Sequence, residues 1–178
     1  MSDGGLGPPQ ETTAIHDGTV VKLRVSDYIR PSGARVRREV IDHPGAVVMI
    51  PVEDEHVLLV RQPRDAIERM TLELPAGKLD GPWESPEDCA RRELAEEVGR
   101  AAARWEDLGG FWTAPAILTE FMHCFLAEDL SLVEGIPDED EEIEVVRHPL
   151  ADLDRLIARA DDAKTLIGLM RLRERLEG

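Results

Sequence analysis

Two apolar runs separated by a short polar turn constrain the fold of this chain most strongly. The runs GAVVMIPV (45–52) and HVLLVRQPR (56–64) flank the turn EDE. Each run has the length of a single strand, and its apolar residues follow one another without a regular polar alternation, which is typical of strands buried on both faces. The sequence therefore predicts two central strands of a sheet.

The segments around these runs predict a mixed fold. Residues 1–11 are rich in Gly and Pro and lack periodicity, so we expect a disordered lead. The segments 19–29 and 34–43 flank the turn RPSG and predict an antiparallel hairpin. Further strands are expected at 72–77, 103–112, 120–128 and 143–148, and helices at 84–99, 150–160 and 163–176. Because strands come first and most helices come late, the chain is interpreted as a single α+β fold.

One helix is marked clearly at both ends. In ESPEDCARRELAEEVG (84–99), Ser85 suits the N-cap, Pro86 the first helical position and Gly99 the position after the last turn. Acidic residues in the first turn also favour the positive end of the helix dipole. We therefore expect a helix that starts after Ser85 and ends at Gly99.

Three glutamates lie on one side of that helix. At about 100° per residue, Glu93, Glu96 and Glu97 fall within a sector of about 100°, directly beside the apolar stripe. One interpretation is an exposed face in which Arg92 forms an ordinary ion pair with Glu96. The other is a group of carboxylates at the edge of the core, beside the Gly-containing turn LPAG, where hard oxygen ligands suit Mg²⁺ or Mn²⁺ better than zinc.

The charge of the chain restricts its partners. The 178 residues carry a formal net charge of -16, which argues against binding to nucleic acid or to an anionic membrane surface. No apolar run approaches the roughly 20 residues needed to span a bilayer, and no secretory signal is recognised, so a cytoplasmic protein is expected. A polyanionic substrate would require a bridging cation, and the three glutamates of the helix are candidates to bind it.

The segment from Gly77 to Arg100 resembles the Nudix box. Glu84, Arg92, Glu93, Leu94, Glu96, Glu97 and Gly99 fall in register with the family pattern. There are two departures: six residues instead of five separate Gly77 from Glu84, and Arg100 replaces an apolar residue. The first lies in a turn, where an insertion costs little, and neither removes a metal ligand.

The rest of the chain, over roughly residues 16 to 170, resembles the ADP-ribose pyrophosphatase branch of this family. VRQPR, LELPAGKLD and Pro115 match its pattern, whereas Ala116 and Ile117 replace the usual Gly and Phe. The resemblance implies a Nudix-type α/β/α sandwich with a mixed central sheet and an N-terminal antiparallel hairpin. It also implies Mg²⁺-dependent hydrolysis of a nucleoside diphosphate sugar, foremost ADP-ribose to AMP and ribose 5-phosphate, with Mn²⁺ as a possible substitute.

The resemblance also assigns roles to individual residues. The metal ligands would be the Ala76 carbonyl, Glu93, Glu97 and Glu141 of the acidic loop PDEDEEIEV. The catalytic group would comprise Glu139 as the base, Glu96 as a further ligand or supporting acid, and Arg92, which would orient the glutamates. The substrate contacts would be Arg37, Arg38 and Arg64. A solvated charge run remains the alternative for the acidic loop, and a surface position the alternative for these arginines.

The same resemblance implies a domain plan and an assembly. The lead of residues 1–11 would precede N-terminal strands at 12–43 and a catalytic domain at 44–178. Members of this branch form homodimers in which the N-terminal strands cross to the partner. Two functional alternatives remain: hydrolysis of another nucleoside diphosphate derivative such as GDP-mannose, and a non-catalytic nucleotide-binding module. The intact RELAEE argues against the second of these.

Overall fold

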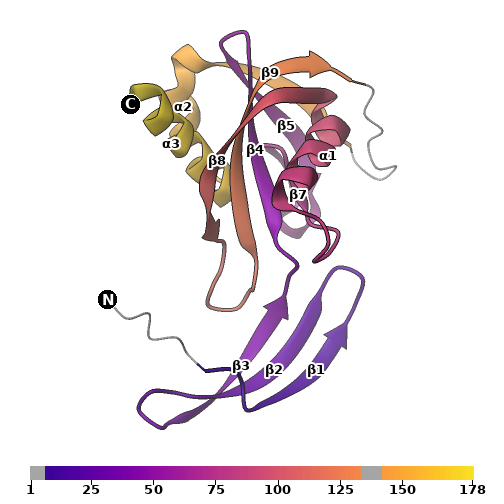
Figure 1. Ribbon diagram of the computed structural model, residues 1–178, viewed down its shortest axis with the longest axis vertical. Helices are drawn as coiled ribbons and strands as arrows, with labels where there is room; N and C mark the ends of the chain where they lie inside the picture. The colour runs from indigo at the N-terminus through magenta and orange to yellow at the C-terminus, as the bar shows by residue number, and fades with distance from the viewer. Residues whose placement is uncertain (1–6, 134–141) are drawn as a thin grey trace. The chain divides into compact units, whose positions relative to one another are not determined.

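The computed structural model describes residues 7–133 and 142–178 (Figure 1). The chain divides into two compact units. The first contains the residues up to Pro44 together with Trp112–Glu120, and the second contains Gly45–Phe111 and Phe121–Gly178. Each unit has its own sheet.

The second unit is built on a mixed seven-stranded sheet. Five strands follow the order β10-β5-β4-β9-β8, in which β4 pairs with β9 in parallel and with β5 antiparallel. The two predicted central strands are thus confirmed at the middle of the sheet. The strand bounds are β4 (Ala46–Glu53), β5 (His56–Arg64), β8 (Arg100–Trp112), β9 (Phe121–Leu132) and β10 (Glu144–Pro149).

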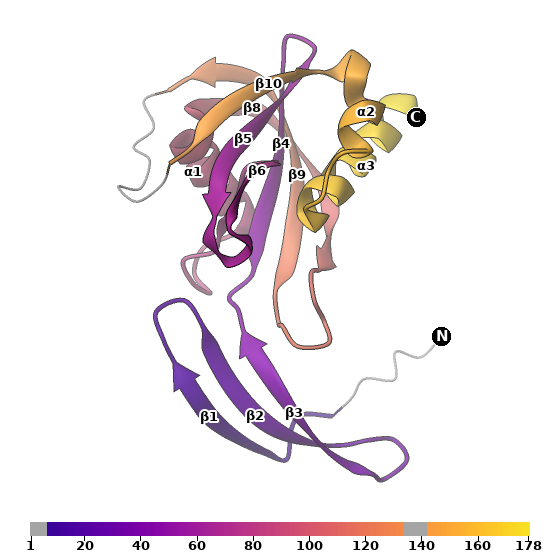
Figure 2. The same ribbon diagram turned by 180° about the vertical axis from the view of Figure 1, so that it is seen from behind.

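A fork between β4 and β5 holds two further strands. Strands β4 and β5 pair only beside their connecting turn, where Val52 lies opposite Val57. Beyond that point β6 (Arg69–Glu73) pairs with β5 (Figure 2), and β7 (Ala76–Lys78) pairs with β4 (Figure 1). We call Glu73–Lys78 the fork segment. The segment 72–77, which the sequence predicts as a short strand broken by Pro75 and Gly77, is divided at Pro75 between two short strands, because Pro75 cannot donate a hydrogen bond to a ladder.

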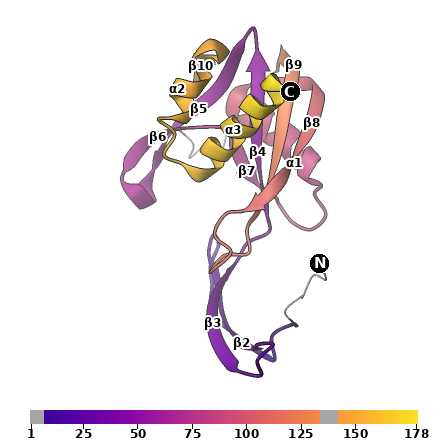
Figure 3. The same cartoon turned by 90° about the vertical axis from the view of Figure 1, so that its left-hand side faces the viewer.

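Helices cover both faces of this sheet (Figure 1, Figure 3). Val47 and Met49 of β4 pack in a cluster with α1 (Pro86–Val98), whereas Val48 and Ile50 pack in a cluster with α2 (Leu153–Ile157) and α3 (Ala163–Glu177). Alternate residues of one strand thus enter two separate cores, which explains its continuous apolar run. The α/β/α sandwich is confirmed. Over the described ranges, no helix is both long and apolar enough to cross a membrane.

The first unit contains a three-stranded antiparallel sheet in the order β1-β2-β3. The predicted hairpin corresponds to β2 (Lys22–Ile29) and β3 (Arg35–Asp42). The additional strand β1 (Glu11–Asp17) was not predicted, and at Glu11 it overlaps the residues expected to be a disordered lead. All seven of its residues are exposed, and it is held by backbone pairing with β2 and by polar side-chain contacts such as that between the hydroxyls of Thr12 and Ser26, so no apolar periodicity marks it in the sequence.

The segment Trp112–Glu120 belongs to the first unit by its contacts. The amide of Ile41 donates to the carbonyl of Ile117 at 2.8 Å, and the amide of Thr119 donates to the carbonyl of Ile41 at 3.0 Å. The amide of His43 donates to Oγ1 of Thr119 at 2.8 Å. These bonds join positions about 76 residues apart in the chain, which local sequence patterns do not reveal.

Candidate active site

Helix α1 presents the predicted glutamates, and its ends are as the sequence predicts. The Ser85 hydroxyl accepts a hydrogen bond from the amide of Asp88 at 3.1 Å, and Pro86 opens the first turn. Gly99 adopts a φ of 66° and its amide bonds to carbonyls of the last turn. A left-handed residue at this position is commonly glycine because it lacks a Cβ. The predicted caps are confirmed.

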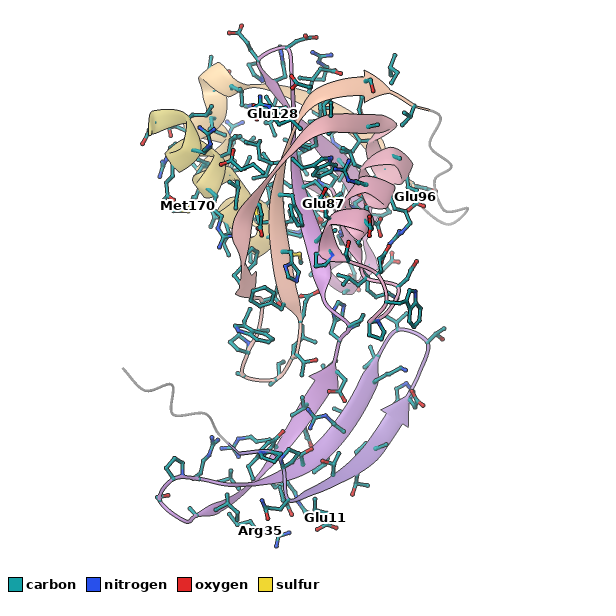
Figure 4. The ribbon with its side chains drawn as sticks, viewed as in Figure 1. Glu11, Arg35, Glu87, Glu96, Glu128 and Met170 are labelled. Carbon is teal, nitrogen blue, oxygen red and sulfur yellow. The ribbon has the colours of Figure 1, made fainter. Side chains whose placement is uncertain are left out.

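The three glutamates differ in exposure in the order expected for residues at the edge of a core. Glu97 is 6% exposed, and the side chains of Glu93 and Glu96 are 13% and 35% exposed. Figure 4 shows Glu96 on α1 together with Glu87 of the first turn. A carboxylate that is nearly buried costs free energy unless it is hydrogen-bonded or bound to a cation. Glu97 therefore needs specific partners.

Arg92 lies among the carboxylates and bonds to three of them. Its Nε donates to Oε1 of Glu84 at 3.0 Å, and its Nη1 donates to Glu93 at 2.8 Å and to Glu96 at 3.0 Å. Partial burial disfavours the charged guanidinium, but the bonds to these carboxylates outweigh it and raise the pKa of Arg92. Arg92 in turn lowers the pKa of Glu84. Arg92 thus connects the three acidic side chains through charge-assisted hydrogen bonds.

The fork segment meets α1 at two points. The backbone amide of Ala76 donates to Oε2 of Glu97 at 3.0 Å. A Cβ placed on Gly77 would lie 1.8 Å from Cδ of Glu93, so a side chain at position 77 would collide with Glu93 where it now lies. Glycine at 77 therefore allows the helix carboxylate to approach the backbone of β7.

A pocket of about 310 Å³ lies between β7, the following loop and α1. Five residues predicted to act together line it: Ala76, Arg92, Glu93, Glu96 and Glu97. Gly77, Lys78 and Asp80 complete the lining. The carboxylates and the strand carbonyls supply oxygen donors, which fit Mg²⁺ or Mn²⁺ in chemistry. Within the described part of the chain no three acidic, His or Cys side chains already converge as a metal cluster, and Arg92 bonds to Glu93 and Glu96.

Arg64, a predicted substrate contact, bonds to a buried carboxylate. Its Nε and Nη2 donate to Oε1 and Oε2 of Glu73 at 2.9 Å and 2.7 Å. The pair raises the pKa of Arg64, and Glu97 adds a smaller contribution in the same direction. Arg64 does not line the pocket at α1 but lies within electrostatic range of it. Sequence reasoning missed Glu73, although it belongs to the segment LELPAGKLD that matches the family pattern.

The predicted contacts Arg37 and Arg38 lie in the first unit and line a different pocket, of about 580 Å³, together with Ala116 and Ile117. Arg37 donates to the buried Asp27 at 2.9 Å, and Arg38 donates to the carbonyl of Arg37 at 2.7 Å. Arg37 and Arg35 lower the pKa of Asp27 to about 2. The pocket therefore contains charges of both signs. Arg35 bonds to Asp27 and to Glu11 of β1; Figure 4 shows Arg35 and Glu11.

The predicted base Glu139 and the predicted additional ligand Glu141 lie outside the described residues. Their roles remain predictions.

Comparison with known proteins identifies the family. The model of the NUDIX domain matches residues 42–169. The chain belongs to the NUDIX family. The ADP-ribose pyrophosphatase of Bacillus subtilis is 40% identical to it, over 92% of this chain and 91% of the relative. The methanol dehydrogenase activator of Bacillus methanolicus is 37% identical, over 91% and 90%. A crystal structure of an ADP compounds hydrolase aligns with a TM-score of 0.85 at 28% identity, over 98% and 97% of the two chains.

Proposed function

We propose that this NUDIX protein hydrolyses the pyrophosphate bond of a nucleoside diphosphate sugar, foremost ADP-ribose, giving AMP and ribose 5-phosphate. The observation that carries the proposal is the pocket in which Glu93, Glu96 and Glu97 meet the backbone of β7 at Gly77. Similarity to the Bacillus subtilis ADP-ribose pyrophosphatase over most of both chains supports this substrate.

The residues of the pocket would bind Mg²⁺, or Mn²⁺ in its place, through the Ala76 carbonyl, Glu93 and Glu97, with Glu96 in support. A bound divalent cation neutralises phosphate oxygens and lowers the pKa of an attacking water. Arg92 would hold Glu93 and Glu96 in place, which reduces the reorganisation needed during the reaction. Glu97 would keep its position through the bond from Ala76.

The reaction needs a proton acceptor as well as charge neutralisation. Water adds to one phosphorus, the bond from that phosphorus to the bridging oxygen breaks, and the water proton must be taken up. We assign that role to Glu139 of the acidic loop, with Glu141 as an additional ligand. Arg64, which Glu73 holds within electrostatic range of Glu97, would contact a phosphate oxygen.

Arg37 and Arg38, which line the pocket of the first unit, remain proposed substrate contacts. This unit also supports the proposal of a homodimer. Among its described residues only Ser26 and Asp27 are buried, and both are polar. A three-stranded sheet without a buried apolar residue needs a covering surface, which a second copy of the chain would supply. Light scattering after size exclusion should give the mass of two chains, and a monomer at micromolar concentration would contradict the dimer.

A substrate panel tests the proposed activity. The ratio kcat/KM would be measured with Mg²⁺ for ADP-ribose, GDP-mannose and UDP-glucose. We expect ADP-ribose to be preferred. A preference for GDP-mannose or UDP-glucose would establish the alternative hydrolase. Calorimetric binding of ADP-ribose without any product in excess Mg²⁺ would establish a non-catalytic module. The cytoplasmic location and the absence of nucleic-acid and membrane partners remain predictions.

A further inference from the structure

The fork segment is contacted from both faces of the sheet. On one face, α1 bonds to Ala76 and packs on Gly77. On the other face, α3 approaches Leu74 so closely that a Cβ on Gly168 would lie 2.5 Å from Cδ1 of Leu74. Ala76, a proposed metal ligand, is therefore only two residues away from a residue that α3 contacts.

Thr165 in the first turn of α3 bonds directly to this segment. The amide of Leu74 donates to its Oγ1 at 2.9 Å, and the same hydroxyl donates to Oδ2 of Asp162 at 2.6 Å. Thr165 is 1% exposed. The hydroxyl thus uses both its acceptor and its donor in a buried place, where losing either bond would leave a backbone or side-chain group unsatisfied.

Lys164 gives the same helix a second contact with the segment. Its Nζ donates to Oε2 of Glu73 and, at 2.8 Å, to Oδ2 of Asp162. The side chain is 11% exposed and lies in the first turn of a helix, where the dipole disfavours a cation. Its position is therefore explained by Glu73 and Asp162 and not by the helix itself.

Glu73 collects bonds from three elements. Besides the bond from Lys164, it accepts hydrogen bonds from Nε and Nη2 of Arg64 and, at 2.6 Å, from the hydroxyl of Thr71. It is 2% exposed, so nearly all of its hydrogen-bonding capacity is used inside the protein. Its orientation fixes Arg64 on one side and the start of the fork segment on the other.

The connection from Leu74 to Ala76 has little freedom. Pro75 restricts its own φ, and its carbonyl accepts from the amide of Met49 at 2.9 Å. Ala76 then pairs with Val48 in the ladder of β7 and β4. Because this connection is short and restricted, we expect a shift of Leu74 to be passed on to the Ala76 backbone, which bonds to Glu97.

We propose that Lys164 and Thr165, on the face of the sheet opposite α1, are positioning residues that set the metal affinity of the pocket at α1 by holding the fork segment. The inference rests on the proposed function, because it assumes that Ala76 and Glu97 take part in binding a divalent cation. Lys164 would act through Glu73 and Arg64, and Thr165 through the amide of Leu74.

The test is Mn²⁺ binding to the substrate-free protein, followed by electron paramagnetic resonance of the free ion. Thr165→Val removes the hydroxyl at similar volume, and Lys164→Gln removes the charge. We expect each to weaken Mn²⁺ binding roughly 10-fold or more, the usual scale for groups that support metal ligands. Thr165→Ser and Lys164→Arg, which keep the hydroxyl and the charge, should restore most of the affinity.

Controls separate positioning from general stability. Arg173 also lies on α3 and forms an exposed ion pair with Asp154 of α2. Arg173→Gln removes this pair and should leave Mn²⁺ binding unchanged. In turnover assays, Thr165→Val and Lys164→Gln should need more Mg²⁺ for half-maximal rate, with kcat recovering at high Mg²⁺. A variant that is merely less stable would show a lower Tm with unchanged Mn²⁺ affinity in its folded fraction.

The outcomes distinguish this inference from the proposed function. If Glu97→Gln loses Mn²⁺ binding while folded Thr165→Val and Lys164→Gln bind like the unchanged protein, the positioning role is wrong and the metal site stands. If Glu97→Gln binds Mn²⁺ as tightly as the unchanged protein, both proposals are wrong. If either Thr165→Val or Lys164→Gln fails to fold, the other variant is compared with Thr165→Ser and Lys164→Arg. Unchanged Mn²⁺ affinity in the variant that folds would overturn the inference.

Discussion

The backbone amide of Ala76 and the carboxylate of Glu97 are joined by a hydrogen bond of 3.0 Å between a short strand and a helix that begins ten residues after Ala76. One carboxylate oxygen of Glu97 is thereby held at the strand, inside a pocket that Glu93 and Glu96 also line. This bond places the acidic face of α1 against the backbone of β7.

Substitution of Glu97 by Gln should separate chemistry from folding. The Gln carbonyl can still accept from Ala76, so the structure should persist, but the negative charge is lost. We expect kcat for ADP-ribose to fall about 100-fold or more, the scale of losing one preorganised electrostatic group. Glu87→Gln on the exposed side of the same helix, paired with Arg91, is the matched control and should keep full activity. Near-normal turnover in Glu97→Gln would show that Glu97 is not part of the active site.

Substitution of Gly77 by Ala should act through Glu93. The added Cβ would lie 1.8 Å from Cδ of Glu93, so that side chain must leave its place. We expect a large loss of kcat/KM and weaker Mn²⁺ binding. In a double-mutant cycle, Gly77→Ala should cost little in a Glu93→Ala background, because the colliding group is absent. Additive losses in the cycle would show that Gly77 acts by another route.

Substitution of Arg92 by Lys should impair the site although the charge is kept. A single ammonium cannot replace the planar guanidinium that bonds to Glu84, Glu93 and Glu96. We expect kcat/KM to fall roughly 10-fold to 100-fold, as for other residues that orient metal ligands. Arg91→Lys, at an exposed position that pairs with Glu87, serves as the comparison. Equal activities for the two variants would contradict the role of Arg92 in orienting the glutamates.

The stability of the protein should depend on pH through Glu73. Burial raises the pKa of Glu73, but bonds from Arg64, Lys164 and Thr71 outweigh it and lower the pKa from 4.5 to about 2. A group whose pKa is lowered by folding stabilises the protein above its unfolded pKa, and this contribution disappears as the pH falls through the folded value. We expect Glu73 to contribute on the order of 3 kcal/mol at neutral pH.

Urea unfolding at several pH values checks this expectation. The difference in free energy of unfolding between the unchanged protein and Glu73→Gln should be largest at pH 7. It should shrink between about pH 4.5 and pH 2, where the unfolded and then the folded carboxylate take up a proton. Comparing the two proteins at each pH cancels the contributions to stability of other acidic groups with a lowered pKa, such as Asp27. A difference that is independent of pH would contradict the assigned ionisation.

Parts of the fold escaped sequence reasoning for identifiable reasons. Strand β1 has no buried residue, so the pattern that reveals other strands is missing there. The segment Trp112–Glu120 belongs to the first unit through bonds to Ile41 and His43, which are far away in the sequence. The network of Glu73 was missed because Lys164 lies 91 residues further along the chain.

The sequence by itself determined the local features of the site. The ends of α1 at Ser85 and Gly99, and the common face of Glu93, Glu96 and Glu97, follow from interactions among residues at most a few positions apart. Tertiary structure decided which backbone these glutamates meet and what holds that backbone. The approach of Gly77 to Glu93 and the bond of Thr165 to Leu74 depend on packing two helices on opposite faces of a forked sheet, and such packing joins residues that no local pattern connects.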